Sequence, residues 1–415
     1  SFIQLIFIQV QIPFSPPFID ADIEAEVLDA LRSGWITTGP KVKALEQEVC
    51  KYTNVPACLG VNSATSGMML ALHWFGVTRG DEVIVPAYTY CATALAVMHL
   101  GATPIMVDVA DDFNIDVEKI RAAITPKTKV IIPVDFAGWP CNYNSIQQLV
   151  TEPSIQQMFV PKGNTQQQLN RILILSDAAH SFGAMYNGKP VGTNADITVF
   201  SFHAVKNLTT AEGGAICFNM PLPFNNDDVY ATFRLWSLNG QTKDAFSKSK
   251  AGSWRYDIVY PGFKMNLPDI LAAIGLAQIK KYNEVLLAER ARVFNHYHSA
   301  FQKYSWAKLP PYSKEGCTSS YHLYPLRINN ISEAQRDAII DVISTTGVAV
   351  NVHFQPLPLL TVFKEKGYQI EHYPLAFNNY ATEISLPIYP QLNNIQCNYI
   401  VTSVVQSVQT ILNNG

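Results

Sequence analysis

The sequence predicts an α/β protein with a mainly parallel sheet, followed by a smaller α+β domain. Between residues 59 and 216, short apolar runs alternate with helical patterns, which is typical of right-handed βαβ units with helices on both faces of the sheet. The expected strands are Val83–Val85, Pro104–Val107, Val130–Ile132, Ile172–Leu175, Ile197–Phe202 and Ala215–Phe218.

The second part of the chain has a different pattern. Long helices, predicted at 287–304, 333–345 and 399–412, are separated by single strands at 321–328 and 348–354. We therefore expect an N-terminal extension at residues 1–22, a large domain at 23–286 and a small C-terminal domain at 287–415.

Composition narrows the class of protein. The chain has 415 residues, of which 48% are hydrophobic, so a large core is available. Its formal net charge is −3 and basic residues form no runs, which argues against nucleic acid or an anionic membrane as a partner.

Seven cysteines without a Cys-x-x-Cys pair predict a reducing compartment and no metal site. The apolar residues 1–10 are too few to span a bilayer, which takes about 20 residues. We expect a cytoplasmic protein.

The first candidate for chemistry is Lys206, which follows the apolar run 197–202 and precedes Gly213-Gly214. A lysine just past a buried strand is desolvated, so its amine loses a proton more readily and can attack a carbonyl. A solvated lysine extending from a strand end is the ordinary alternative, and Lys206 alone does not exclude it.

Asp177 strengthens the case. It ends the apolar run Ile172–Ser176, at the carboxyl edge where open α/β sheets bind ligands. A carboxylate there can keep a pyridinium nitrogen protonated, while Lys206 holds the aldehyde of the same ring as a Schiff base. These two anchors let pyridoxal phosphate act as an electron sink. The alternative role for Asp177 is a helix N-cap.

A third anchor would hold a phosphate. Asn62-Ser-Ala-Thr-Ser-Gly67 precedes a helical pattern, and the amides at the start of a helix bind phosphate. Ser63, Ala64 and Thr65 are therefore candidate phosphate-binding residues.

Together these motifs resemble a known family. Ser63-Ala-Thr65, Asp177-Ala-Ala-His180, Ser201-Phe-His-Ala-Val-Lys206 and Glu212-Gly-Gly214 are similar to motifs of the DegT/DnrJ/EryC1/StrS sugar aminotransferases. Ser33-Gly-Trp-Ile-Thr-Thr-Gly-Pro40, Pro261–Asp269 and Val352-His-Phe354 resemble the UDP-4-amino-4-deoxy-L-arabinose–oxoglutarate aminotransferase branch. The resemblance implies the fold-type-I architecture of enzymes that use pyridoxal phosphate, with a seven-stranded sheet in the large domain.

The resemblance also implies further site residues. Tyr90 matches an aromatic ring stacked on the cofactor, with Tyr88 as the alternative. His180 matches a position near the cofactor's ring oxygen, and Ser201 matches a phosphate contact. Each of these has an ordinary structural alternative in the core or at a helix start.

Other matched residues would contact the nucleotide sugar. They are Thr37, Thr38, His353 and Phe354, together with Arg255 in the polar segment 239–261, which also holds Lys243, Lys248 and Lys250. Lys264 replaces the asparagine of the usual Gly-x-Asn-x-Arg motif and would reach the partner subunit's phosphate. The resemblance therefore implies a homodimer with shared active sites.

Residues 142–170 depart from the related sequences. They are rich in glutamine and asparagine, and we expect a surface excursion that turns at Lys162–Asn164.

These observations favour an aminotransferase that converts a 4-keto nucleotide sugar to the amino sugar, with L-glutamate as the amine donor. The amino sugar would be used in lipopolysaccharide or another cell-surface polysaccharide. Two alternatives stay open: a pyridoxal-phosphate sugar dehydratase, which usually has histidine in place of Lys206, and a non-catalytic regulatory relative.

Overall fold

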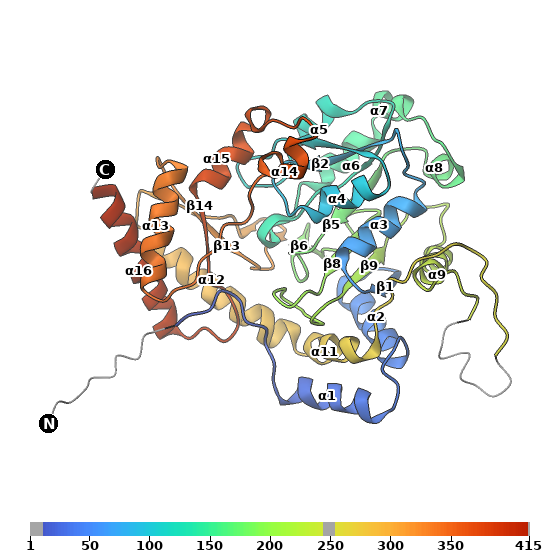
Figure 1. The fold of residues 1–415 in the computed structure, drawn as a ribbon, viewed down its shortest axis with the longest axis horizontal. Helices are drawn as coiled ribbons and strands as arrows, with labels where there is room; N and C mark the ends of the chain where they lie inside the picture. Colours follow the sequence, from blue (N-terminus) through green and yellow to red (C-terminus); the bar gives the residue numbers. More distant parts are fainter. Residues whose placement is uncertain (1–10, 244–253, 414–415) are drawn as a thin grey trace.

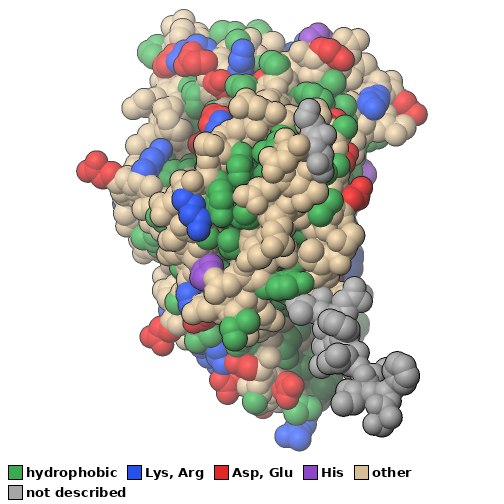
Figure 2. Space-filling view, turned by 90° about the vertical axis from the view of Figure 1, so that its left-hand side faces the viewer, with side chains coloured by type: hydrophobic (Ala, Val, Ile, Leu, Met, Phe, Trp, Pro, Cys, Tyr) green, Lys and Arg blue, Asp and Glu red, His purple; other side chains and the backbone are tan. Residues whose placement is uncertain are grey.

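The structure is a computed structural model that describes residues 11–243 and 254–413. Figure 1 shows a large body built around a sheet, and a smaller body at the other end of the molecule, where both ends of the described chain lie. On the face formed by the smaller body, acidic and basic side chains are scattered among polar and hydrophobic ones (Figure 2).

The large body contains a seven-stranded sheet in the order β1-β9-β8-β5-β4-β2-β3. Strand β9 runs antiparallel to both of its neighbours, and the other pairs are parallel. The prediction of a mainly parallel sheet is thus confirmed. The strands are β1 (Ala57–Val61), β2 (Glu82–Pro86), β3 (Thr103–Val107), β4 (Thr128–Ile131), β5 (Leu173–Asp177), β8 (Ile197–Ser201) and β9 (Gly214–Phe218).

Helices cover this sheet, and their ends carry recognisable signals. Helix α2 begins with Pro40 at its first position and ends at a left-handed Asn54, both of which are favoured there. The helices of the large body are α1 (Ala21–Arg32), α2 (Pro40–Thr53), α3 (Ala64–Trp74), α4 (Ala92–His99), α5 (Val117–Ala123), α6 (Tyr143–Thr151), α7 (Pro153–Met158), α8 (Asn164–Leu169), α9 (Asn226–Ser237) and α11 (Asp269–Ile279), with a 3₁₀ turn at Phe136–Gly138.

The smaller body is α+β, as predicted. A π-helical turn at Tyr282–Leu287 leads into α12 (Ala288–Phe301). A three-stranded antiparallel sheet in the order β10-β13-β14 packs against helices. The elements of this part of the chain are β10 (Ala307–Lys308), β13 (Tyr324–Ile328), α13 (Glu333–Thr345), α14 (Thr361–Lys364), α15 (Pro374–Thr382), β14 (Glu383–Leu386) and α16 (Asn394–Asn413), with 3₁₀ turns at Leu357–Leu359 and Ile370–His372. Leu357 and Phe363 of α14 and the turn before it pack in the core of the large body.

A four-stranded sheet of two-residue strands lies between these parts of the chain. Its order is β11-β12-β6-β7, and the pairing of β12 with β6 joins the chain after α12 to the loop after β5. The strands are β6 (Met185–Tyr186), β7 (Lys189–Pro190), β11 (Ser313–Lys314) and β12 (Cys317–Thr318).

Three local predictions need correction. The strand expected at 348–354 is reduced to single bridges at Val348 and Asn351. The reason is that His353 forms hydrogen bonds with side chains of β14 instead of with the backbone of that strand. The excursion expected at 142–170 is helical, and α6 buries Tyr143, Ile146 and Leu149. The strand expected at 321–328 begins only at Tyr324.

The start of the described chain is integrated into the fold. Ile12 is buried in the core of the smaller body and pairs with Val348, so residues predicted as an extension contribute to packing. The domain boundaries at 22/23 and 286/287 remain predictions, and the expectation for residues 1–10 lies outside the described residues.

Candidate active site

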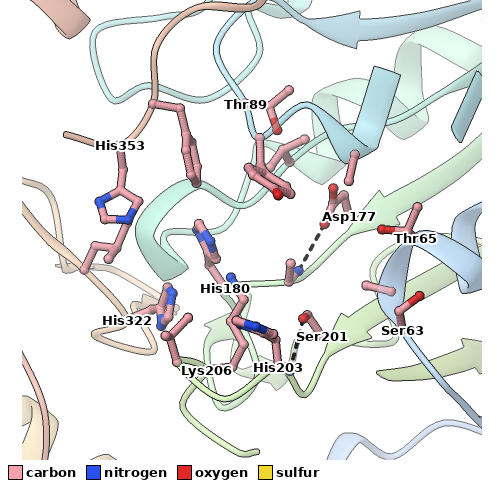
Figure 3. Close-up of a pocket in the computed structure, with 18 of the residues that line it drawn as sticks. Ser63, Thr65, Thr89, Asp177, His180, Ser201, His203, Lys206, His322 and His353 are labelled. Carbon is pink, nitrogen blue, oxygen red and sulfur yellow. Dashed lines mark hydrogen bonds between the residues drawn. The ribbon is translucent and has the colours of Figure 1, made fainter. Parts of the chain in front are cut away.

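A cavity of about 520 Å³ lies at the carboxyl edge of the large sheet. Asp177 ends β5 and Ser201 ends the adjacent parallel strand β8, so both side chains come to the same edge. His322 and His353 close the opposite side (Figure 3). The cavity therefore lies between the two bodies of the protein.

Lys206 lines this cavity in the loop after β8, where its backbone N–H donates to the carbonyl of His203 at 2.9 Å. Burial lowers the pKa of the Lys206 amine to about 8; nearby Asp177 opposes this shift and Arg290 adds to it. A neutral amine is therefore accessible near physiological pH, as nucleophilic attack requires.

Asp177 is 5% exposed and faces the same cavity. Its Oδ2 accepts from Thr93 Oγ1 at 2.8 Å, and its Oδ1 accepts from the backbone N–H of Ala179 at 3.2 Å. Burial raises the pKa of Asp177, while these two hydrogen bonds and the charge of Lys206 oppose the rise. The carboxylate is thus held in place with its charge available to a cation in the cavity.

Replacing Thr93 with valine tests this arrangement. Valine keeps the shape but removes a hydrogen bond to a charged group, which contributes about 1.5–3 kcal/mol. We expect the pKa of Asp177 to rise further and kcat to fall roughly 10-fold or more, with the acidic limb of the kcat–pH profile moved to higher pH. An unchanged acidic limb would show that Thr93 does not support the carboxylate.

The predicted phosphate-binding loop lies at the other end of the cavity, on the side of Asp177 (Figure 3). Ser63 is the N-cap of α3 and accepts from the N–H of Ser66 at 3.1 Å. Ala64 and Thr65 begin α3 and also line the cavity, as does Ser201. Helix amides and three hydroxyl groups thus converge where a phosphate group would bind.

Gly214 allows this loop to pack against β9. A Cβ atom on Gly214 would lie 2.7 Å from the carbonyl oxygen of Phe200 and 2.9 Å from the amide nitrogen of Ala64. Both contacts are with backbone, which has no flexible end that could move aside.

The Gly214→Ala variant is expected to displace the start of α3. We expect roughly 1–3 kcal/mol of destabilisation from overpacking and at least a tenfold weaker affinity for cofactor, measured by denaturant unfolding and cofactor titration. Gly163→Ala is the matched control, because nothing lies within 4 Å of its added Cβ. Equal cofactor affinity in both variants would contradict the role given to Gly214.

His180 is held as a neutral side chain. Its Nδ1 accepts from the backbone N–H of Ala137 at 3.2 Å, so the ring proton is on Nε2. Burial, Lys206 and His353 all hold the pKa of His180 well below its usual range. Its ring lies 4.3 Å from that of His322, whose Nδ1 is 2.9 Å from Asn207 Oδ1.

The two tyrosine candidates are separated clearly by the structure. Tyr90 lines the cavity, and its ring centroid is 5.8 Å from that of Phe354. Tyr88 is 1% exposed and donates its hydroxyl hydrogen bond to the carbonyl of His353. Tyr88 is therefore a core residue, and Tyr90 is the candidate for the ring that stacks on the cofactor.

Only part of the predicted sugar-binding set meets at this cavity. His353 and Phe354 line it, whereas Thr38 binds Leu267 and Asn266 beside a second cavity. Thr37 and Lys264 are exposed elsewhere, and Arg255 stacks on Trp254 at 5.2 Å. Within one chain these four residues lie outside the cavity of Lys206, and their contacts with substrate or phosphate stay predictions. Lys248 and Lys250 are outside the described residues.

Several residues in or behind the cavity wall were not predicted. Thr93 supports Asp177 from α4, and Thr89 is 3.1 Å from Thr93. Phe14 stacks on His353 with ring centroids 5.4 Å apart, and Ser15 lies beside the Lys206 loop. Thr89 and Thr93 are about one helical turn apart, and this spacing was the only sign in the sequence that Thr93 belongs to the site. Nothing in the sequence marks Phe14.

Comparison with known proteins agrees with this geometry. The structure superposes on a putative sugar aminotransferase from Streptococcus pneumoniae in its PMP-form with a TM-score of 0.92 and 43% identity, covering 97% of this chain and 100% of that one. Helicobacter pylori PseC, an aminotransferase involved in the biosynthesis of pseudoaminic acid, gives a TM-score of 0.84 at 27% identity over 97% and 100% of the chains. The spore coat polysaccharide biosynthesis protein SpsC of Bacillus subtilis is 32% identical over 97% of both sequences.

The fold and the site therefore define a sugar aminotransferase that depends on pyridoxal phosphate. Residues 17–159 and 164–405 match the DegT/DnrJ/EryC1/StrS aminotransferase family. The chain belongs to this family, as its motifs predict. Across residues 11–243 and 254–413, no helix is long and apolar enough to cross a membrane.

Proposed function

We propose that this protein transfers an amino group from L-glutamate to the keto group of a 4-keto nucleotide sugar. The observation that carries the proposal is that Lys206 and Asp177 share one cavity with the loop that begins α3. Pyridoxal phosphate, when bound, supplies an electron sink for the carbon that exchanges its amino group.

The residues present fit this cofactor. Ser63, Thr65 and Ser201 offer hydroxyl groups, and the N-terminus of α3 offers amides, to a phosphate. The backbone contacts around Gly214 leave no room for a side chain beside this loop. Asp177 would pair with a protonated ring nitrogen, Tyr90 would stack on the ring, and His180 would donate from Nε2 to the ring oxygen.

Lys206 has two roles in the proposal. Its amine would hold the cofactor through the aldehyde group, and as a free base it would move the proton at the reacting carbon of the substrate. Its lowered pKa supports both roles, because each requires the neutral form. The presence of lysine at this position also favours transamination over the dehydratase alternative.

The sugar is proposed to lie against His353 and Phe354. The motifs at Ser33–Pro40 and Pro261–Asp269 favour a 4-amino-arabinose type of product, and the name of SpsC supports a role in cell-surface polysaccharide synthesis. Lipopolysaccharide as the destination and a cytoplasmic location remain proposals from the sequence.

We also propose a homodimer. Leu28, Leu31 and Ile36 are 45%, 51% and 53% exposed in the single chain, which suits a surface covered by a second copy. Thr37, Thr38, Arg255 and Lys264 would then serve the partner's cavity. Sedimentation should give a dimer, and a fully active monomer would contradict the proposal.

The first test is an absorbance titration of cofactor-loaded protein with L-glutamate alone. We expect the band of the lysine-bound cofactor to decrease while the amine form and 2-oxoglutarate appear in equal amounts. Lys206→Ala is the control that should not produce this change. If neither glutamate nor glutamine alters the wild-type band, the dehydratase and non-catalytic alternatives become the better interpretations.

A further inference from the structure

A chain of hydrogen bonds connects the cavity with a buried carboxyl group on β14. His353 lines the cavity, and its Nδ1 is 2.9 Å from Ser385 Oγ. Ser385 Oγ donates in turn to Oε1 of Glu383. Glu383 and Ser385 are two residues apart on a strand, so their side chains share one face. Both side chains are fully buried, with 0% of each residue exposed.

The other oxygen of Glu383 fixes the orientation of the carboxyl group. Oε2 accepts from the backbone N–H of His353 at 3.0 Å, so a proton on Glu383 belongs on Oε1, toward Ser385. Nε2 of His353 has no hydrogen-bond partner among the described side chains, and it is the ring nitrogen left for a ligand in the cavity.

Two proton arrangements satisfy the same geometry. With Glu383 ionised, Ser385 donates to the carboxylate and accepts from Nδ1–H of His353, which leaves Nε2 as an acceptor. With Glu383 protonated, Glu383 donates to Ser385 and Ser385 donates to Nδ1, which leaves Nε2–H as a donor. The charge state of Glu383 therefore decides what His353 offers to the cavity.

The surroundings of Glu383 set the pH at which one proton arrangement replaces the other, and this pH is near neutral. Burial raises the pKa of Glu383 to about 8, against the opposing effects of its two hydrogen bonds and of Arg336 and Arg327. Tyr88 also faces Glu383. Burial and the charge of Lys206 lower the pKa of His353 to about 3, so its imidazolium form is not available as an acid.

We infer that Glu383, Ser385 and His353 form a proton relay that donates from His353 Nε2 to the keto oxygen of the amino-group acceptor. The inference rests on the proposed function for the identity of this acceptor. His353 is the residue that touches substrate, and Ser385 and Glu383 act through it.

The proton balance of the relay is simple. The Nε2 proton passes to the oxygen that leaves as water, the Ser385 proton passes to Nδ1, and the Glu383 proton passes to Ser385 Oγ. The substrate gains one proton, Glu383 becomes a carboxylate, and no electrons are exchanged. One proton from solvent, returned through Nε2, restores the starting arrangement.

The tautomer of His353 provides a direct test that does not depend on turnover. Protein labelled with ¹⁵N-histidine gives NMR signals from nine histidine side chains. The signals that are missing from His353→Gln are those of His353. We expect His353 to change from the Nε2–H to the Nδ1–H tautomer as the pH rises through about 8. Glu383→Gln should hold the Nε2–H tautomer at every pH, because its amide donates permanently to Ser385.

Two further variants provide controls. In Ser385→Ala, the tautomer of His353 should no longer depend on the charge state of Glu383. Glu46→Gln is a matched control for Glu383→Gln: Glu46 is also buried with a pKa raised to about 7, but it binds Gly60 and Tyr230 away from the cavity. Thermal unfolding verifies that each variant is folded. One tautomer throughout pH 6–10 in the wild type, or the same change in Glu383→Gln, would overturn the relay.

A kinetic measurement tests the donation step. In the reaction of the amine-loaded enzyme with 2-oxoglutarate, the wild-type rate should fall above about pH 8. Glu383→Gln should be about 100-fold slower, as for loss of a general acid, and its rate should not depend on pH in this range. Equal rates for Glu383→Gln and Glu46→Gln would refute the relay. Absence of reaction in the wild type would instead refute the proposed function, and the tautomer measurement would still decide the relay.

Discussion

Replacing Lys206 with alanine is expected to lower kcat by about 10⁴-fold or more, since the variant loses both the attachment point of the cofactor and a general base. The absorbance band of the lysine-bound cofactor should be absent, while the phosphate-binding loop and Asp177 still allow cofactor to bind reversibly. Retention of more than a tenth of the wild-type rate would show that another group performs these roles.

The same lysine predicts a pH dependence. Because burial lowers the pKa of Lys206 to about 8, the neutral amine is the minor form below that pH and the major form above it. The rate of cofactor attachment to the apoenzyme should therefore rise with pH and level off above about 8. An ordinary exposed lysine would continue to gain reactivity up to about pH 10.4.

Asp177→Asn is the second change with a large expected effect. The substitution keeps the size of the side chain but removes the negative charge that we propose pairs with the cofactor ring, so we expect a fall of about 10³-fold in kcat, comparable to the loss of a major electrostatic contact. Binding of cofactor should weaken much less, because the groups proposed to hold its phosphate are unchanged. Absorbance spectra of the loaded variant should show the ring nitrogen unprotonated.

Asp108→Asn is a suitable control for this experiment. Asp108 is also buried, but it accepts from the backbone N–H groups of Leu375 and Ala376 at the start of α15. Its replacement should reduce stability and leave the spectrum of bound cofactor unchanged. Equal losses of kcat in the two variants would indicate that burial of a carboxylate, rather than the position of Asp177, explains the effect.

The sequence predicted best those site residues whose positions depend on their own strand or helix. Lys206, Asp177 and the Ser63–Thr65 loop each follow a buried strand or begin a helix, and parallel strands bring such positions to one edge. The apolar runs are long enough to mark those strands without knowledge of their partners.

Residues that depend on contacts distant in sequence were less predictable. Glu383 and Ser385 are 30 and 32 positions from His353, and each alone looks like an ordinary strand residue. Thr37, Thr38 and Arg255 were assigned by resemblance, which implies active sites shared between two subunits, so a single chain does not test their positions. The strand predicted at 348–354 failed because side-chain hydrogen bonds replaced strand pairing there.

The antiparallel direction of β9 has a consequence for the lysine loop. Ser201 at the end of β8 is paired with Gly214 at the start of β9, so residues 202–213 leave the sheet and return to it at the same place. Such a closed loop has little freedom to drift relative to the sheet, and its position depends on the pairing at its base. A change in β9 that shifts this pairing by one residue would therefore move Lys206 relative to the α3 loop, although Lys206 itself lies outside the strand.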